Sequence, residues 1–239
     1  MSLNKNKNKN KNKSLNKTGS IFPANGWDPE MEAVAELPNF FEIQGWRDLP
    51  LDPPPGPAQT KVELAELLNK QVQMQNPAFR QIRQPEIELE AGDDTPFYQR
   101  ALTPTPSGSF AATSVLIDAM SHLGTVVGCH YKKKFMRPRP SQLEPRLRPS
   151  LDVPAHAAYP SGHALQNFLI AQALAIVVQS DELTVELFNI AQRVAENREY
   201  AGLHYESDTI AGKQLAFAMF PAVQDAYRET FQSAAREWL

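Results

Sequence analysis

Residues 161–178 read SGHALQNFLIAQALAIVV and are the stretch that decides the fold. Ser161 is a favoured helix N-cap residue, and Pro160 ends the segment before it. Apolar side chains then fill most positions as far as Val178, with neither Pro nor a run of turn residues among them. The stretch therefore predicts a helix that begins at Ser161 and runs through Val178.

Helical spacing extends to both sides of this stretch. From Ser107 to Phe135, apolar residues recur at steps of three and four, which is the period of a helix with one buried face. A third helix is predicted over Leu183–Ala201, and a fourth over Ser207 to about Leu239, with a break near Pro221.

The first hundred residues are less regular. Residues 21–60 are rich in Pro and aromatics and end in a polyproline-like connection, Pro53-Pro54-Pro55-Gly56-Pro57. Thr60 is then predicted to cap a helix over residues 60–74, whose apolar face would suit either a core or the interface of a homo-oligomer. The acidic stretch 86–94 is interpreted as a surface loop, and so is the segment 137–160, which is rich in Pro and Arg.

Strand alternation is nearly absent, so the predicted fold class is all-α, a helical bundle. Residues 1–20 alternate Asn and Lys and are predicted to form a disordered tail, because they offer almost nothing to bury. Residues 21–239 are then predicted to form a single domain. Without the six lysines of the tail, 18 basic residues face 27 acidic ones, which argues against a nucleic-acid partner.

Membrane and redox signals are also weak. The best apolar run, residues 164–178, contains Gln166, Asn167 and Gln172 and falls short of the roughly 20 residues that cross a bilayer. No apolar stretch of the secretory kind follows the basic tail. The chain is therefore expected to have no transmembrane segment and to be cytoplasmic. Its single cysteine, Cys129, excludes an internal disulfide and is expected to be buried as a small apolar residue.

Three polar clusters lie where predicted helices begin or end. The first starts as Lys132-Lys133-Lys134 and continues to Arg139-Pro140 and Arg148. Residues 132–148 hold seven positive charges and one acidic residue. Taken alone, this cluster would fit a solvated basic face; Lys133, Lys134, Arg137 and Arg146 are expected to attract anions without touching a reacting group.

The second cluster is Pro160-Ser161-Gly162-His163, at the start of a predicted helix. Free N–H groups at a helix N-terminus bind phosphate-like anions, and Gly162 has no side chain to obstruct their approach. His163 lies beside that position and could exchange protons near neutral pH. A plain helix cap with a surface histidine is the alternative for this motif alone.

The third cluster runs from Asn197 to Asp208. Arg198 lies at the end of one helix, Gly202 terminates it, and His204 precedes the next. Asp208 follows four residues later, within reach of the His204 ring. A carboxylate on one ring nitrogen fixes the tautomer and leaves the other nitrogen as a nucleophile or ligand. By itself, the pair could also be a helix cap.

In order, the clusters read K-x6-R-P, P-S-G-H and R-x5-H-x3-D. This pattern resembles the tripartite signature of the type 2 phosphatidic acid phosphatase (PAP2) and vanadium-dependent haloperoxidase superfamily. Its third motif is S-R-x5-H-x3-D, and Asn197 stands where the family has Ser. The matching span, residues 132–208, covers about a third of the chain, and the predicted helices fit the helical bundle of that family.

The resemblance implies a role for each matching residue. It implies that Lys132, Arg139 and Arg198 bind the oxygens of an oxyanion, and that Ser161 and the Gly162 backbone N–H complete the site. The roles implied for the catalytic residues are attack on phosphorus by His204, proton transfer by His163 and orientation of the nucleophile by Asp208.

The resemblance leaves the reaction open between two branches. A metal-independent phosphatase with a phosphohistidine on His204 and a small phosphorylated substrate is the first reading, since three cations would neutralise the phosphoryl charge. The compact chain and Phe135-Met136-Arg137 favour it. The alternative is a haloperoxidase whose vanadate cofactor is ligated by His204, and Ala201-Gly202-Leu203-His204-Tyr205 resembles that branch. A non-catalytic oxyanion-binding protein is the third reading. His156 either lines the mouth of the site or is an ordinary loop residue.

Overall fold

Helix α8 (Gly162–Val178) lies in the middle of the fold and begins where the sequence predicts it. The Ser161 hydroxyl accepts a hydrogen bond from the backbone N–H of Ala164 at 3.4 Å and caps the helix. Most side chains of α8 are buried, as expected of a helix that is apolar all round. The computed structural model describes residues 28–43, 45–92, 95–102 and 110–239, so the predicted tail lies outside the described residues.

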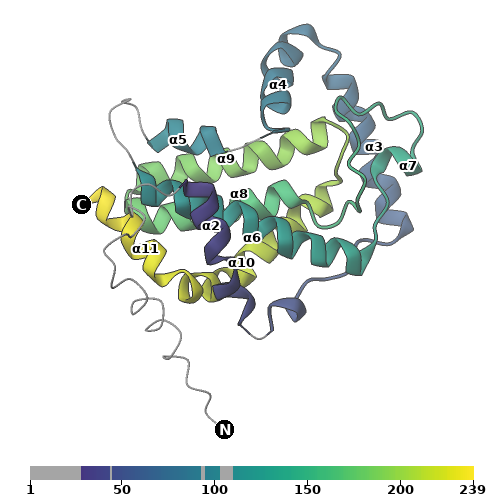
Figure 1. Cartoon of the computed structure of the whole chain (residues 1–239). Coiled ribbons are helices and arrows are strands. Elements are labelled where there is room, and N and C mark those ends of the chain that lie inside the picture. The colour runs from purple at the N-terminus through teal and green to yellow at the C-terminus, as the bar shows by residue number, and fades with distance from the viewer. Residues whose placement is uncertain (1–27, 44, 93–94, 103–109) are drawn as a thin grey trace, which may run out of the picture.

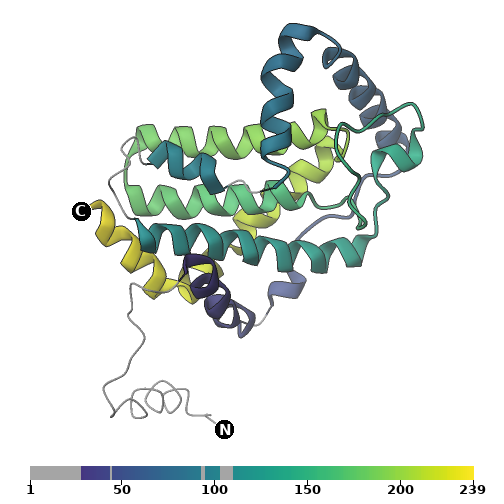
Figure 2. The same ribbon diagram turned by 45° about the horizontal axis from the view of Figure 1, so that its top comes forward.

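Three long helices pack around α8. They are α6 (Ala111–Phe135), α9 (Asp181–Tyr200) and α10 (Glu206–Ala226). In Figures 1 and 2, α6, α8 and α9 run side by side as three tiers, with α10 behind them. Helices α2 (Pro29–Phe41) and α11 (Arg228–Ala235) pack on α6, and the short helix α5 (Thr95–Leu102) packs on α9. The described residues contain no strand, and the all-α prediction is confirmed.

Helices α3 (Pro57–Gln73) and α4 (Pro77–Leu89) form a hairpin that projects from one end of the bundle. The short helix α7 (Pro140–Leu143) lies beside it, and the C-terminus is at the opposite end (Figure 2). Two short 3-10 helices, η2 (Trp46–Asp48) and η3 (Arg236–Trp238), complete the elements of the described residues. On α3, Leu67 is buried against Leu147 and Tyr205, so part of its apolar face belongs to the core of this chain.

Several boundaries differ from the predicted ones. Helix α3 begins at Pro57 instead of after Thr60, because Pro is well suited to the first helical position. The Thr60 hydroxyl donates to the carbonyl of Pro55 instead of capping the helix. The predicted break near Pro221 is absent: α10 continues through it, and the change of direction comes at Tyr227.

The acidic stretch 86–94 was expected to be a surface loop, and this is wrong for its first half. Asn76 caps α4 by accepting from the backbone N–H groups of Ala78 and Phe79, and the helix runs to Leu89. Glu90 follows as its C-cap and is buried. The periodicity of α4 is hard to see because Arg83 and Glu90 take core positions where apolar residues are the rule.

The helical stretch Ala111–Leu143, which comprises α6 and α7, is 33 residues long and is apolar enough over one window to cross a membrane. The stretch is not an unbroken apolar run, because small polar residues interrupt the pattern without adding charge. Within this stretch, Asp118 is the one acidic residue. By length and composition, the expectation of a chain with no transmembrane segment is therefore wrong.

Gly212 of α10 allows this helix to lie directly on the start of α8. A Cβ at this position would lie 2.5 Å from the Ser161 carbonyl oxygen and 3.0 Å from the Leu165 backbone nitrogen. Both are backbone atoms and cannot move without shifting the helix start. We expect Gly212→Ala to lower the free energy of unfolding by about 1–3 kcal/mol, measured by denaturant titration. Gly92→Ala, whose added Cβ would have an ordinary contact at 3.9 Å, is the matched control. Equal stability of the two variants would contradict this packing.

Candidate active site

The three sequence clusters meet around one pocket of about 170 Å³. The C-terminal part of α6, the segment after it, the start of α8 and the junction between α9 and α10 all contribute. Six of the predicted site residues line the pocket: Lys132, Arg139, Gly162, His163, Arg198 and His204. The other two lie behind its wall and are fully buried: Ser161 caps α8, and Asp208 contacts His204.

His204 has its tautomer fixed from both sides. Its Nδ1 lies 3.0 Å from Asp208 Oδ2, and its Nε2 lies 3.1 Å from Arg139 Nη1. Because a guanidinium only donates, Nε2 must accept, and the ring proton lies on Nδ1 toward the carboxylate. Burial, and then the nearby cations, hold the pKa of His204 well below its ordinary value. The ring is thus neutral and presents the lone pair of Nε2 beside Arg139.

Asp208 is held by more than His204. Its carboxylate also accepts from the backbone N–H of Tyr205 at 3.1 Å and from Arg137 at 2.6 Å. Arg137 donates in addition to Glu63, at 2.8 Å, and all three of these charged side chains are buried. The expectation that Arg137 is a surface cation is therefore wrong, since this residue bridges two buried carboxylates.

His163 is partly buried at the start of α8, and its Nε2 lies 3.2 Å from the carbonyl oxygen of Glu90. A carbonyl only accepts, so Nε2 carries the ring proton and Nδ1 is left for proton exchange. Burial, together with three nearby cations, lowers the pKa of His163 to about 3. A bound dianion would offset those cations and raise this pKa.

Arg198 lines the pocket, and one of its donors is unsatisfied. Its Nη2 donates to the carbonyl of Ile87 at 3.0 Å and to Glu90 Oε2 at 2.7 Å. The side chain is almost completely buried, yet its Nε has no hydrogen-bond partner among the described residues. A buried guanidinium N–H without an acceptor is costly. An oxyanion in the pocket would supply the missing acceptor.

The amine of Lys132 is not free to bind an anion, because backbone carbonyls surround it. Its Nζ donates to the carbonyls of Ala157, Ala158 and Pro160, at 3.1, 3.0 and 2.5 Å. These three bonds use all three of its N–H donors. Lys132 therefore secures the segment before α8 while it adds positive charge to the pocket.

Three residues that sequence analysis left open or misplaced also belong to this region. Nδ1 of His156 lies 3.1 Å from Arg139 Nη2, and its carbonyl accepts from Arg139 Nε at 3.0 Å, so His156 lines the pocket beside that cation. Cys129 was expected to be buried, and this is wrong: it is exposed at the pocket edge. Glu90 was missed, because its partners Asn197 and Arg198 lie more than a hundred residues away.

Comparison with known proteins extends this picture. The chain is similar to the crystal structure of the first transmembrane PAP2-type phosphatidylglycerolphosphate phosphatase from Bacillus subtilis, with a TM-score of 0.53 and 17% sequence identity. The match covers 84% of this chain and 96% of that one. No family model matches the sequence, and no curated protein matches it. The chain therefore has the fold of a PAP2-type phosphatase.

This similarity also corrects two expectations. The similar structure is that of a transmembrane protein, and the stretch Ala111–Leu143 has the length and composition of a membrane-crossing helix. The expectations of a chain with no transmembrane segment and of a cytoplasmic location are both wrong. Both expectations rested on the apolar run 164–178 and on the segment after the basic tail, and neither of these contains the stretch Ala111–Leu143.

Proposed function

We propose that this chain is a phosphoric monoester hydrolase of the PAP2 superfamily that works through a phosphohistidine on His204 and needs no metal ion. The observation that carries the proposal is the arrangement around His204 Nε2. This nitrogen bears a lone pair, because the ring proton lies on Nδ1 toward Asp208, and it belongs to a pocket lined by Lys132, Arg139 and Arg198. Arg139, which donates to this nitrogen in the empty site, would turn to a phosphoryl oxygen when the substrate binds. Three cations around one nucleophile suit a phosphoryl group.

The reaction would proceed in two displacements. In the first, the substrate monoanion passes its proton to His163 Nδ1 as it binds. His204 Nε2 then forms a bond to phosphorus as the ester P–O bond breaks, and His163 Nδ1 gives that proton to the departing alkoxide. In the second, the now neutral His163 takes a proton from water, whose oxygen bonds to phosphorus as the P–N bond breaks. His163 then passes this proton to the phosphate product, which leaves, and both histidines return to their neutral starting state.

Each cation would have its own part in stabilising the charge of the phosphoryl group. Arg198 would satisfy its unpartnered Nε with a phosphoryl oxygen, and Arg139 lies next to the attacking nitrogen. The backbone N–H groups at the start of α8, near Gly162, add the positive end of a helix dipole. The fixed positive charge does the work that a metal ion does in other phosphatases.

The haloperoxidase alternative would place vanadate on the same residues, with His204 as its ligand. Phosphate and vanadate are both tetrahedral oxyanions, and no feature of the described site favours vanadate. The similar structure is that of a phosphatase. The phosphatase is therefore the function proposed, and vanadate is expected to act as an inhibitor.

The test measures inorganic phosphate released by the purified full-length chain in detergent, with EDTA present. Two monoesters serve as substrates, phenyl phosphate and phosphatidylglycerolphosphate, the lipid named for the similar structure. We expect chelator-resistant release that vanadate inhibits. If neither ester is hydrolysed and vanadate with peroxide oxidises bromide, the proposal is wrong and the haloperoxidase alternative is right.

The low pKa of His163 predicts an acidic pH optimum. In the free enzyme this ring is neutral above about pH 3, so the proton for the leaving group must arrive with the substrate monoanion. A phosphate monoester loses that proton near pH 6. We expect kcat/KM for an alkyl phosphate to be highest between these two values and to fall about tenfold per pH unit above the upper one. A fall in kcat/KM below about pH 6.5, the ordinary pKa of histidine, would contradict the account.

A further inference from the structure

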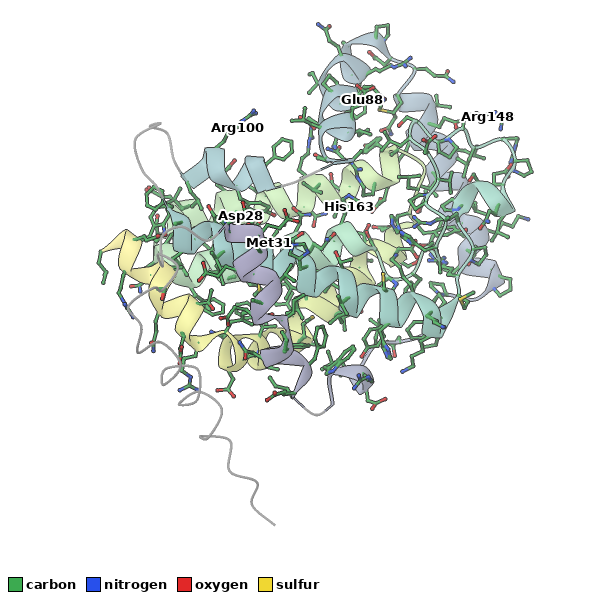
Figure 3. The ribbon with its side chains drawn as sticks, viewed as in Figure 1. Asp28, Met31, Glu88, Arg100, Arg148 and His163 are labelled. Carbon is green, nitrogen blue, oxygen red and sulfur yellow. The ribbon has the colours of Figure 1, made fainter. Side chains whose placement is uncertain are left out.

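Helix α4 ends against the candidate site, and its last contact is made by Glu90. This residue is the C-cap of α4, and only 2% of it is exposed. In Figure 3, Glu88 is labelled on the α3–α4 hairpin, two residues before Glu90, and His163 is labelled in the bundle below it. A buried carboxylate next to a predicted anion site is unexpected, because it adds a charge of the same sign as the substrate.

The carboxylate of Glu90 holds Arg198 in place. Glu90 Oε2 accepts from Arg198 Nη2 at 2.7 Å, and Oε1 accepts from Asn197 Nδ2 at 2.7 Å. The backbone N–H of Asn197 belongs to α9, so the contact with Glu90 is made by the side-chain nitrogen. Both carboxylate oxygens are therefore engaged by adjacent residues of one helix, and the Arg198 side chain is fixed with its Nε left over for a ligand.

Asn197 is also the one position at which the third motif departs from the family pattern. Its Oδ1 accepts from Arg83 of α4, and its Nδ2 donates to Glu90. A serine hydroxyl at this position could not reach across to these partners in both directions. The departure from the pattern therefore belongs to the same set of contacts that places Glu90.

The backbone of Glu90 acts on the second site residue. Its carbonyl oxygen lies 3.2 Å from His163 Nε2 and fixes which ring nitrogen carries the proton. One residue at the end of α4 thus touches both Arg198 and His163, which come from α9 and α8. Shifting it would disturb the anion clamp and the proton-transfer group together.

We infer that Glu90 is a positioning residue that orients Arg198 through its carboxylate and His163 through its main-chain carbonyl. The inference rests on the proposed function and extends it to the α3–α4 hairpin. The carboxylate also offsets part of the positive charge of Arg198, so it weakens the binding of the phosphate product while it keeps the guanidinium in place.

Two variants separate the effect of the negative charge of Glu90 from the effect of its side-chain length. Glu90→Gln keeps the length and removes the charge, whereas Glu90→Asp keeps the charge and cannot reach Asn197 and Arg198 together. We expect kcat for phenyl phosphate to fall about 10- to 100-fold in both, because the clamp loses its alignment. The inhibition constant for inorganic phosphate should fall several-fold in Glu90→Gln only, since only this variant removes the competing negative charge.

The matched control is Glu86→Gln. Glu86 lies one turn earlier on α4 and contacts Arg193 and Asn197 but, in the described contacts, neither Arg198 nor His163. We expect its kcat to equal that of the wild type. Values of kcat in Glu90→Asp and Glu90→Gln equal to that of Glu86→Gln would overturn the inference. So would a parallel loss of kcat and phosphate affinity in Glu90→Gln, which indicates general damage to the site.

The proposed function and this inference fail in different ways. If the wild type releases no phosphate from either ester, the proposed function fails. Binding of inorganic phosphate, measured by calorimetry on the wild type, Glu90→Gln and Glu86→Gln, still tests the charge of Glu90: tighter binding in Glu90→Gln alone supports its contact with Arg198. If the wild type is active and all three variants match it, only the inference fails.

Discussion

Replacing His204 with alanine is expected to reduce phosphate release by about 10⁴-fold or more. The substitution removes Nε2, the nitrogen that attacks phosphorus in the proposed mechanism, and leaves Arg139 and Arg198 to bind the anion. Steady-state release from phenyl phosphate measures the effect. Phosphate binding should persist in the variant, because the cations that line the pocket remain.

His122→Ala is the control for this substitution. His122 is half-buried on α6 and lies 3.6 Å from Glu30, outside the pocket. We expect its activity to match the wild type, and thermal unfolding should show that both variants are folded. If His204→Ala retained more than about a tenth of the wild-type kcat, nucleophilic attack by this residue would be ruled out.

Loss of Arg137 is expected to have the largest effect on stability. Its guanidinium bridges Asp208 at 2.6 Å and Glu63 at 2.8 Å, and it lies 3.7 Å from the centre of the Tyr205 ring. Arg137→Leu would leave two buried carboxylates without their cation. Breaking a buried ion pair in this way costs about 3–5 kcal/mol, measured as the change in free energy of unfolding in denaturant.

Lys133→Ala provides the comparison, because Lys133 is an exposed cation of the same cluster. Its stability should differ from the wild type by no more than about 0.5 kcal/mol. The sequence-based interpretation gave both residues one role, the attraction of anions at the surface. If Arg137→Leu were as stable as Lys133→Ala, and only its KM at low salt rose, that interpretation would be correct.

Local signals account for the parts of the fold that were predicted well. A serine that caps a helix acts within three residues, so the start of α8 at Ser161 could be predicted from the sequence. Gly202 likewise marks the end of α9, with a φ of 76° that suits glycine. The family resemblance carried by the three motifs also predicted which residues would share a pocket, and six of the eight line it.

Contacts between distant segments account for the parts that were missed. Arg83 of α4 and its C-cap Glu90 are buried, and each contacts a partner on α9 that no local pattern indicates. Arg137 is one of several cations in its sequence cluster, and its partner Glu63 lies on α3, 74 residues earlier. A charged residue is expected at the surface unless it is paired, and the pairs form only when the chain has folded.

The most direct test of the central claim is a search for the phosphoryl-enzyme. His163→Ala is mixed with p-nitrophenyl phosphate, whose leaving group needs little protonation, and the reaction is quenched in base, where phosphohistidine survives. Because His163 would activate the water of the second step, the intermediate should accumulate. Peptide mass spectrometry should then find the phosphoryl group on His204. A burst of p-nitrophenol with no phosphoryl group on His204, or with the group on another residue, would contradict the account.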